Sequence, residues 1–371
     1  MNNRKLKIVK KCLTIILAGI MVIATSFPSC AKTSSSKISL SLSGKRAVIM
    51  DMDSGKVLYS KNAKTKCHNA STTKLMTAIV AVEKNKSLNK KVTISGNAAG
   101  ADGVSLSFGR GSRYRMKDLL HGMLLPSAND CAVAIAEGTS GSVNKFMKEV
   151  NKKAKKLGCK KTHFGTPNGL RSSKTHYTTA YDLALIMKYA YENTTIRKIL
   201  QKKKYSFKSL SGRRHTVTTT NRLLSSKNYY CVGKTGNGWT AKYCFTGVYT
   251  YKGHSYVIVT LGSSQEGGRF SDAKKMIAVC KSHAKKVRKN LSLNKPTAEL
   301  QAGKSVQLKV TGVKKGVKWS STNEEIAVVD DTGKVTGKKA GKTTIYAKIY
   351  GKTLKCKIEV LQSDIENDTS E

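Results

Sequence analysis

Closely spaced cysteines are missing from this sequence. It contains nine cysteines but no Cys-x-x-Cys pair, so zinc-ribbon and thioredoxin-type chemistry have no basis here. The seven histidines show no metal-ligand spacing either, and we predict no metal and no cofactor. Several cysteines lie in apolar contexts, where a thiol behaves as a small hydrophobic group. We therefore expect core thiols without an essential disulfide.

Acidic residues are scarce. There are 22 of them against 68 lysines and arginines, which gives a formal net charge of +46. Such a chain concentrates near polyanions. A nucleic acid is not predicted, because the lysines are spread along the chain and no helix-turn-helix, zinc-finger or aromatic RNA-binding signature is present. Anionic cell-envelope polymers or a membrane surface are the expected partners, and a solvated basic surface without a specific partner stays open.

The N-terminus has the pattern of an export signal. Five cations precede an apolar stretch at residues 13–24, and Ser29-Cys30-Ala31 resembles a small-residue cleavage site. We predict a signal peptide over residues 1–31 and an extracytoplasmic protein, in the cell wall or at the outer face of the cytoplasmic membrane. The apolar stretch is short for a spanning helix; a retained anchor and a lipid at Cys30 also stay open.

After a Ser-rich linker at residues 32–41, residues 42–287 have an α+β pattern. A β-hairpin is predicted at residues 46–59 around Asp53-Ser54-Gly55. Helices are expected at 71–82, 116–125, 130–137, 143–157, 179–191 and 272–287, and strands at 229–234, 244–251 and 254–263. Strands at both ends with helices between them predict an antiparallel sheet whose terminal segments pair around a helical insert.

Beyond residue 288 the pattern changes to short alternating strands separated by glycines. This pattern predicts a small all-β sandwich over residues 289–361, followed by an acidic, disordered tail at 362–371. The string from Val317 to Asn323 and the glycines that follow it resemble bacterial Ig-like group 2 domains. The resemblance implies a spacer or adhesive module, in which Trp319 is the core aromatic.

Three short strings carry the chemistry: Ser71-Thr72-Thr73-Lys74, Ser127-Ala128-Asn129 and Lys234-Thr235-Gly236. In this order they supply a serine nucleophile, a lysine one helical turn away, a hydroxyl/amide pair and a cationic strand. Ser-x-x-Lys also occurs elsewhere, for example at Ser282 and Lys285. Only Ser71 opens an apolar helical run, where free N–H groups and the helix dipole favour negative charge.

The surrounding residues resemble the low-molecular-mass penicillin-binding proteins, the serine-type D-alanyl-D-alanine carboxypeptidases. The similarity is close at His68-Asn-Ala-Ser-Thr-Thr-Lys-Leu-Met-Thr77 and Leu124-Leu-Pro-Ser-Ala-Asn-Asp130, and it continues through Thr162–Leu170 and His176–Leu183. It implies the penicillin-binding-protein/β-lactamase-like transpeptidase fold. It also implies removal of the terminal D-alanine from peptidoglycan stem peptides, with β-lactam antibiotics as covalent inhibitors.

The resemblance agrees with the roles that the residue types suggest. Ser71 attacks the carbonyl, and Lys74 is its base if burial and Lys234 keep it neutral. Ser127 relays a proton, and Asn129 holds the substrate amide and the lysine. Lys234 and Thr235 suit a terminal carboxylate, Gly236 admits the substrate backbone, and Asn237 completes an oxyanion hole with Ser71.

Two departures and several rivals stay open. Gly233 stands where the family usually has a bulky residue, and Lys242 where it commonly has glycine. A class A β-lactamase shares the three strings but needs a glutamate loop, and residues 162–174 contain no acidic residue. A DD-endopeptidase or transpeptidase, and a catalytically degenerate wall-binding protein, complete the set of rivals. Asp130 is expected to be structural.

Overall fold

The computed structural model describes residues 38–170 and 175–362. The predicted signal peptide with Cys30, residues 32–37 of the linker and nearly all of the acidic tail lie outside the described residues. Among the helices that are described, none is both long enough and apolar enough to cross a membrane.

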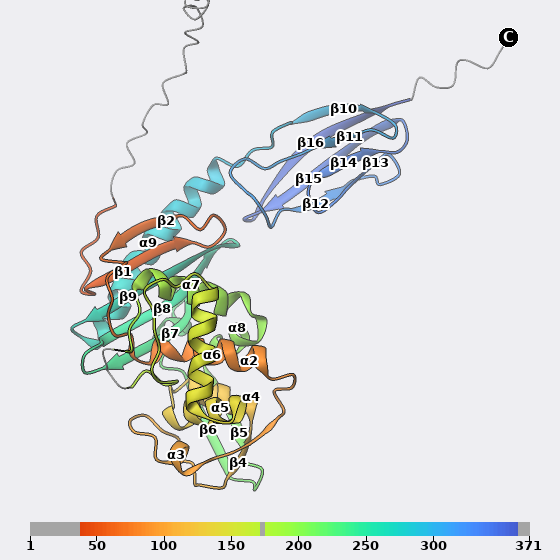
Figure 1. Ribbon diagram of the computed structural model, residues 1–371. Coiled ribbons are helices and arrows are strands. Elements are labelled where there is room, and N and C mark those ends of the chain that lie inside the picture. Colours follow the sequence, from red (N-terminus) through yellow and green to blue (C-terminus); the bar gives the residue numbers. More distant parts are fainter. Residues whose placement is uncertain (1–37, 171–174, 363–371) are drawn as a thin grey trace, which may run out of the picture. The chain divides into compact units, whose positions relative to one another are not determined.

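A five-stranded antiparallel sheet forms the centre of the first region, in the order β2-β1-β9-β8-β7 (Figure 1). Its strands are β1 (Arg46–Asp51), β2 (Val57–Lys61), β7 (Val232–Gly238), β8 (Lys242–Tyr251) and β9 (His254–Ser263). β1 pairs with β9, which confirms that the terminal segments of this region meet around a helical insert. β7 forms one edge of the sheet, and one side of its backbone is therefore available for another chain.

Helical structure fills the middle of the chain. The elements are η1 (Ala70–Thr73), α2 (Lys74–Lys84), α3 (Gly96–Ala99), α4 (Met116–Leu124), α5 (Asn129–Ser140), α6 (Val143–Lys156), α7 (Ala180–Glu192), α8 (Thr194–Leu200) and η2 (Arg222–Ser225). The elements α3, α8 and η2 were not predicted, and the others match predicted helices to within a few residues. The short pairs β3 (Lys91–Thr93) with β4 (Arg113–Arg115) and β5 (Lys204–Lys208) with β6 (Arg214–Thr218) were not predicted.

The sheet separates two hydrophobic layers. On one face it packs on the helical region, and α7 contacts β1, β8 and β9 there. On the other face it packs on α9 (Glu266–Lys289), whose Phe270, Met276 and Ile277 meet Phe245 of β8. The first string lies on η1 and the start of α2, and the second between α4 and the start of α5, both on the helical side of the sheet. The third string lies on the edge strand β7, so the sheet supports one side of the site.

Gly233 of β7 lies beside Phe245, on the face of the sheet that packs on α9. A Cβ at this position would lie 2.2 Å from the carbonyl oxygen of Thr246 and 3.1 Å from the Phe245 ring. The β8 backbone and the Phe245 ring therefore occupy the space that a side chain at position 233 would need. The departure at Gly233 is a change of packing behind the sheet.

Replacement of Gly233 by Ala should destabilise the fold by about 3 kcal/mol, because the obstructing atoms are backbone atoms of β8 that cannot rotate away. Gly267 is the matched control, since a Cβ there meets nothing within 4 Å. Gly267→Ala lies on a helix and should be neutral or stabilise by about 0.5 kcal/mol. Urea unfolding measures both, and equal stabilities would contradict this account of Gly233.

The second region is a two-sheet sandwich. One sheet has the order β10-β16-β15-β12 and the other β11-β14-β13. The strands are β10 (Thr297–Gln301), β11 (Ser305–Gln307), β12 (Lys318–Ser321), β13 (Ala327–Val329), β14 (Lys334–Gly337), β15 (Gly341–Ile349) and β16 (Lys352–Leu361). Trp319 is partly buried against the core and closes on Gly333, where a Cβ would lie 2.6 Å from its ring.

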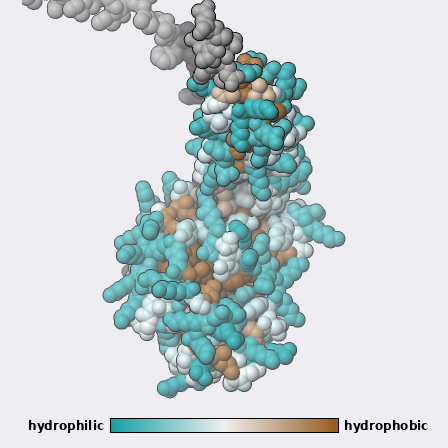
Figure 2. Space-filling view, turned by 90° about the vertical axis from the view of Figure 1, so that its right-hand side faces the viewer, coloured by the Kyte–Doolittle hydropathy of each residue, from teal (hydrophilic) through white to brown (hydrophobic). Residues whose placement is uncertain are grey.

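The surface agrees with the basic composition. Hydrophilic residues cover most of the face shown in Figure 2, and hydrophobic ones appear between them without forming one large patch. Seven described cysteines are free and six of them are buried, as expected for core thiols. Burial raises the pKa of the Cys159 and Cys244 thiols to about 12, which keeps them protonated and unreactive.

Candidate active site

Ser71 lies in the short 3-10 helix η1, which leads into α2. The preceding residue, Ala70, has a positive φ of 47°, which is strained for a residue with a side chain. Asn69 fixes this turn, because its side-chain amide donates to the hydroxyls of Thr72 and Thr73. The chain thus bends sharply just before Ser71, and the α-helix begins about one turn later than the sequence pattern suggests.

Lys74 is the first residue of α2 and is completely buried. Its Nζ lies 2.8 Å from Ser71 Oγ, 2.6 Å from Asn129 Oδ1 and 3.2 Å from the carbonyl oxygen of Asn168. A fourth neighbour, Ser127 Oγ, is 3.4 Å away. The lysine therefore joins the first and second strings at one nitrogen atom.

These neighbours suit a neutral amine. The oxygens of Asn129 and Asn168 can only accept hydrogen bonds, so they take the two N–H groups of an NH2 group. The remaining lone pair is then free to accept the proton of the Ser71 hydroxyl. Burial, and next the charge of Lys234, hold the pKa of Lys74 well below its usual range, as predicted. This position and this lowered pKa are those that a general base requires.

Ser127 lies in the turn between α4 and α5. Its φ is 74°, a left-handed conformation that costs about 1 kcal/mol for a residue other than glycine. This conformation carries Ser127 Oγ to within 2.9 Å of Lys234 Nζ as well as near Lys74. The hydroxyl consequently connects the two lysines. The strained backbone conformation of Ser127 is the one that places its hydroxyl there.

Asn129 begins α5 and holds the lysine from the other side. Its amide nitrogen donates to the carbonyl oxygen of Asp102, at 2.6 Å, while Oδ1 accepts from Lys74. Asp130 next to it is fully buried and accepts from Ser105 and from the Leu106 and Cys131 N–H groups. Asp130 therefore has the expected structural role.

A pair of Ser127 variants separates the hydroxyl from the backbone strain. Ser127→Ala and Ser127→Gly both remove Oγ, and both should slow acylation by a β-lactam by about 100-fold. Only glycine relieves the left-handed conformation, so Ser127→Gly should be more stable than Ser127→Ala by about 1 kcal/mol. Thermal unfolding and a stopped-flow acylation assay test the two parts, and equal stabilities would contradict the strain.

The third string lies on the edge strand β7. Lys234 is 1% exposed, and its Nζ donates to Ser127 Oγ and to the carbonyl oxygen of Thr235. The Thr235 hydroxyl lies 2.6 Å from the hydroxyl of Thr220. Burial first, and then the charge of Arg269, lower the pKa of Lys234 to about 7.

Arg269 of α9 supports the same strand from behind. Its Nη1 donates to the carbonyl oxygen of Gly236 at 3.0 Å, and it is 5% exposed. A Cβ at Gly236 would lie 2.9 Å from the carbonyl oxygen of Asn69, so we attribute this glycine to the close packing of η1 on β7. That Gly236 also admits the substrate backbone stays a prediction. Asn237 follows as an exposed residue of the strand.

Lys242 begins β8, immediately after the turn that follows β7. Its φ is 52°, which explains why a glycine suits this position in the family. The side chain lies over the ring of Trp239, 5.0 Å from the ring centre. Trp239 itself is 91% exposed. The departure at Lys242 thus places a cation in a strained backbone conformation beside the end of β7, next to the exposed Trp239.

Three residues near the strings were not predicted: Asn168, Thr220 and Arg269. Asn168 acts through its backbone oxygen, which any residue type supplies, so no side-chain pattern could reveal it. Thr220 and Arg269 orient the third string from distant parts of the chain. Their contribution depends on tertiary contacts that sequence spacing does not encode.

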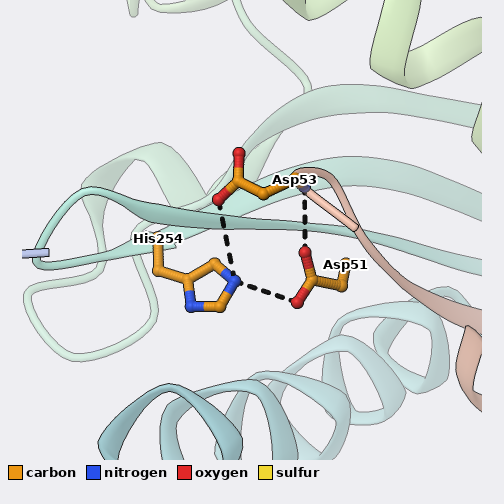
Figure 3. Close-up of side chains that lie close together, drawn as sticks. All are labelled: Asp51, Asp53 and His254. Carbon is orange, nitrogen blue, oxygen red and sulfur yellow. Dashed lines mark hydrogen bonds and ion pairs between the residues drawn. The ribbon is translucent and has the colours of Figure 1, made fainter. Parts of the chain in front are cut away.

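One group among the described residues has the composition of a metal site: Asp51, Asp53 and His254 (Figure 3). Hydrogen bonds within the chain already engage it. His254 Nε2 lies 2.9 Å from Asp51 Oδ2, and Asp51 Oδ1 accepts from the N–H groups of Asp53 and Ser54. Burial raises the pKa of Asp51, but these hydrogen bonds outweigh it and leave the pKa lowered. We therefore assign the group a structural role, in which His254 of β9 is joined to the end of β1 and the turn that follows it.

Comparisons with known proteins agree with this geometry. The family model for D-alanyl-D-alanine carboxypeptidases matches residues 31–265, and that for the bacterial Ig-like domain (group 2) matches residues 288–358. The chain is 34% identical over 273 residues to the D-alanyl-D-alanine carboxypeptidase DacF of Bacillus subtilis, covering 72% of this chain and 70% of the relative.

Two further similarities concern one Streptomyces protein. The D-alanyl-D-alanine carboxypeptidase of Streptomyces sp. K15 is 33% identical over 282 residues, covering 71% of this chain and 95% of the relative. The crystal structure of the Streptomyces K15 DD-transpeptidase superposes with a TM-score of 0.62 at 31% identity. That superposition covers 65% of this chain and 98% of the other.

Proposed function

Because the chain belongs to the D-alanyl-D-alanine carboxypeptidase family, we propose that it removes the terminal D-alanine from peptidoglycan stem peptides through an acyl-enzyme on Ser71. One observation carries the proposal. The Nζ of a fully buried Lys74, whose pKa is strongly lowered, lies 2.8 Å from Ser71 Oγ. A neutral amine in this position can accept the serine proton without a histidine.

Acylation follows from these contacts. As Ser71 Oγ attacks the carbonyl carbon of the penultimate D-alanine, its proton moves to Lys74 Nζ. The negative charge that develops on the carbonyl oxygen is met by the backbone N–H groups of Ser71 and Asn237. Such a donor contributes about 3–4 kcal/mol in other acyl-transfer enzymes.

Ser127 completes the proton path. The leaving group is the amine of the terminal D-alanine, and it must gain a proton as the C–N bond breaks. Ser127 Oγ lies between the nitrogens of Lys74 and Lys234, so it can donate its own proton to the amine and recover one from Lys74. Water then attacks the ester, Lys74 accepts the proton from this water, and Ser71 leaves with a proton.

Lys234 and Thr235 bind the terminal carboxylate of the substrate in this proposal. An ammonium group and a hydroxyl give charge-assisted hydrogen bonds to a carboxylate, and Thr220 holds the threonine hydroxyl. The substrate peptide lies along the free side of β7 as an added strand, a common mode of peptide recognition at a sheet edge.

The rivals differ in how the acyl-enzyme is resolved. A transpeptidase transfers the acyl group to an amine, and an endopeptidase forms it on a crosslink; the K15 relative carries both a carboxypeptidase and a transpeptidase name. A β-lactamase needs an activated water, and the described residues 162–170 hold no acid to activate it. The intact lysines and serines argue against a degenerate wall-binding protein. Hydrolysis of the D-Ala-D-Ala bond remains our proposal.

An extracytoplasmic site of action is typical of the family. We propose that the mature chain begins after residue 31, that residues 42–287 form the catalytic domain, and that residues 289–361 form an Ig-like spacer or adhesive unit. The net charge of +46 favours anionic wall polymers or the membrane surface as its surroundings. β-Lactam antibiotics are the expected covalent inhibitors.

D-alanine release from a D-Ala-D-Ala pentapeptide tests the activity. The full chain should release D-alanine, and Ser71→Ala should lower the rate by at least about 10³-fold. Ser282→Ala is the matched control, because Ser282 and Lys285 repeat the Ser-x-x-Lys spacing on the exposed face of α9. It should retain the full rate. Release that survives in Ser71→Ala, or no release at all, would refute the proposal.

A further inference from the structure

A cationic cavity lies beside the end of the proposed substrate strand. Its volume is about 530 Å³, and four of its lining side chains are cations: Lys45, Arg46, Lys66 and Lys242. None of the described residues that line it is acidic. None of the four cations forms an ion pair with a described carboxylate, although the described chain contains several ion pairs elsewhere.

Two buried nitrogens at this cavity have no hydrogen-bond partner among the described residues. They are Arg46 Nε and His68 Nδ1, and both residues belong to the cavity lining. A buried polar atom without a partner costs about 1–3 kcal/mol, so native structures rarely leave one unsatisfied. Lys66 and Lys242 are placed over the rings of Tyr177 and Trp239. The cavity thus gathers positive charge and leaves polar atoms unsatisfied.

The cavity adjoins both catalytic segments. His68 lies three residues before Ser71, and Thr240 to Lys242 lie where the turn after β7 leads into β8. The end of β7 packs on the nucleophile turn, where a Cβ at Gly238 would lie 3.5 Å from the Cβ of Ala70. A group held in the cavity is therefore close to a peptide bound along β7.

The direction of the bound peptide follows from the proposed function, on which this inference rests. Its terminal carboxylate lies at Lys234 and Thr235, and its scissile carbonyl lies at Asn237. Each residue of an extended strand advances the chain by about 3.3 Å. The residues upstream of the D-Ala-D-Ala pair therefore continue past Gly238 toward the turn at Trp239 and Lys242, which borders the cavity.

We propose that this cavity is a substrate subsite that binds a carboxylate on one of the two residues upstream of the D-Ala-D-Ala pair. The carboxylate accepts hydrogen bonds from Arg46 and His68, and Lys66 and Lys242 neutralise its charge. Trp239 lies beside Lys242 and covers the upstream part of the peptide. The subsite selects anionic stem peptides over neutral ones without taking part in bond breaking.

Matched peptides test the charge preference. Two N-acetylated tetrapeptides ending in D-Ala-D-Ala carry glutamate at one of the two upstream positions, and their counterparts carry glutamine there. We expect kcat/KM for D-alanine release to be about 5-fold higher with glutamate at one of these positions. The preference should fall toward unity in 1 M salt, where the screening length is only about 3 Å.

A double variant assigns the preference to the cavity. Lys66→Gln with Lys242→Asn removes two of its charges, and asparagine tolerates the left-handed conformation at position 242. This variant should lose the glutamate preference while its rates with the glutamine peptides and with penicillin stay within about 2-fold of the parent. Lys338→Gln with Lys339→Gln removes the same charge at exposed positions of the sandwich and should keep the preference.

Direct binding separates this proposal from the carboxypeptidase activity. A chain with Ser71→Ala and Trp319→Phe cannot form the acyl-enzyme and has Trp239 as its single tryptophan. Its fluorescence, titrated with each peptide, should give a dissociation constant about 5-fold lower for the preferred glutamate peptide. If no D-alanine is released but this difference is found, the proposed activity fails and the subsite stands. Equal constants, or no binding of the peptides, would overturn the subsite.

Discussion

Replacement of Lys74 by Met is expected to slow acylation of the protein by penicillin by about 10³-fold. The methionine side chain is close to lysine in length but has no nitrogen that can accept the proton of Ser71. The variant loses the hydrogen bonds from Lys74 to Asn129 and Asn168, which lowers stability. It also no longer buries an amine away from water, which raises stability. We therefore expect the fold to persist and the chemistry to fail.

Lys84→Met is the control for this prediction. Lys84 ends the same helix, but its side chain is exposed, and its one ion pair among the described residues is with Glu149. The variant should acylate at the parent rate and lose less than about 1 kcal/mol of stability. Stopped-flow acylation and thermal unfolding of the two variants give the comparison. A Lys74→Met protein that is folded and acylates within tenfold of the parent would remove Lys74 from the role of base.

The pH dependence of kcat/KM is expected to show a falling limb above about pH 7. The pKa of Lys234 is lowered to about 7 by burial and by Arg269, and a lysine is a cation only below its pKa. The free enzyme therefore loses the positive charge that binds the terminal carboxylate as the pH rises. With one proton involved, kcat/KM should approach a tenfold fall per pH unit and be about 50-fold lower at pH 9 than at pH 7.

Two further measurements sharpen this prediction. The bound carboxylate favours protonated Lys234, so the corresponding limb of kcat should lie at higher pH than that of kcat/KM. In Lys234→Arg the limb should disappear, because the guanidinium stays charged, although the lower fit will reduce the rate. A parent profile that is flat to pH 9 would show that Lys234 keeps its charge in the free enzyme.

The same shift has a cost for stability. In the unfolded chain Lys234 has its ordinary pKa near 10.5, so between about pH 7 and 10.5 the unfolded state binds more protons than the folded state. This group's contribution therefore makes the fold more stable as the pH rises through that window. At neutral pH and below, the buried lysine lowers stability, as groups arranged for catalysis commonly do.

The sequence predicted the main elements because their patterns are local. The apolar run of α2, the hairpin around Asp53 and the alternating strands of the sandwich each show a period that depends on burial of one face. The pairs β3–β4 and β5–β6 were missed because strands of three to five residues carry too little pattern. Because β1 pairs with β9, and β9, β8 and β7 pair in turn, β7 becomes an edge of the sheet.

The three strings themselves could be selected from the sequence. The backbone conformations and backbone contacts that position their side chains could not. The positive φ at Ser127 and Ala70 has no sequence signature, since both residues ordinarily avoid this conformation. The role of Asn168 lies in its backbone. The atoms behind Gly233 belong to Phe245 and the backbone of β8, so the sequence around Gly233 does not reveal them.

The site of the penicillin adduct tests the central claim most directly. The full chain is incubated with a labelled penicillin, digested, and its peptides are weighed by mass spectrometry. We predict one stable adduct, on the peptide that contains Ser71, and no adduct in Ser71→Ala. An adduct on another residue, or labelling that is unchanged in Ser71→Ala, would contradict the account.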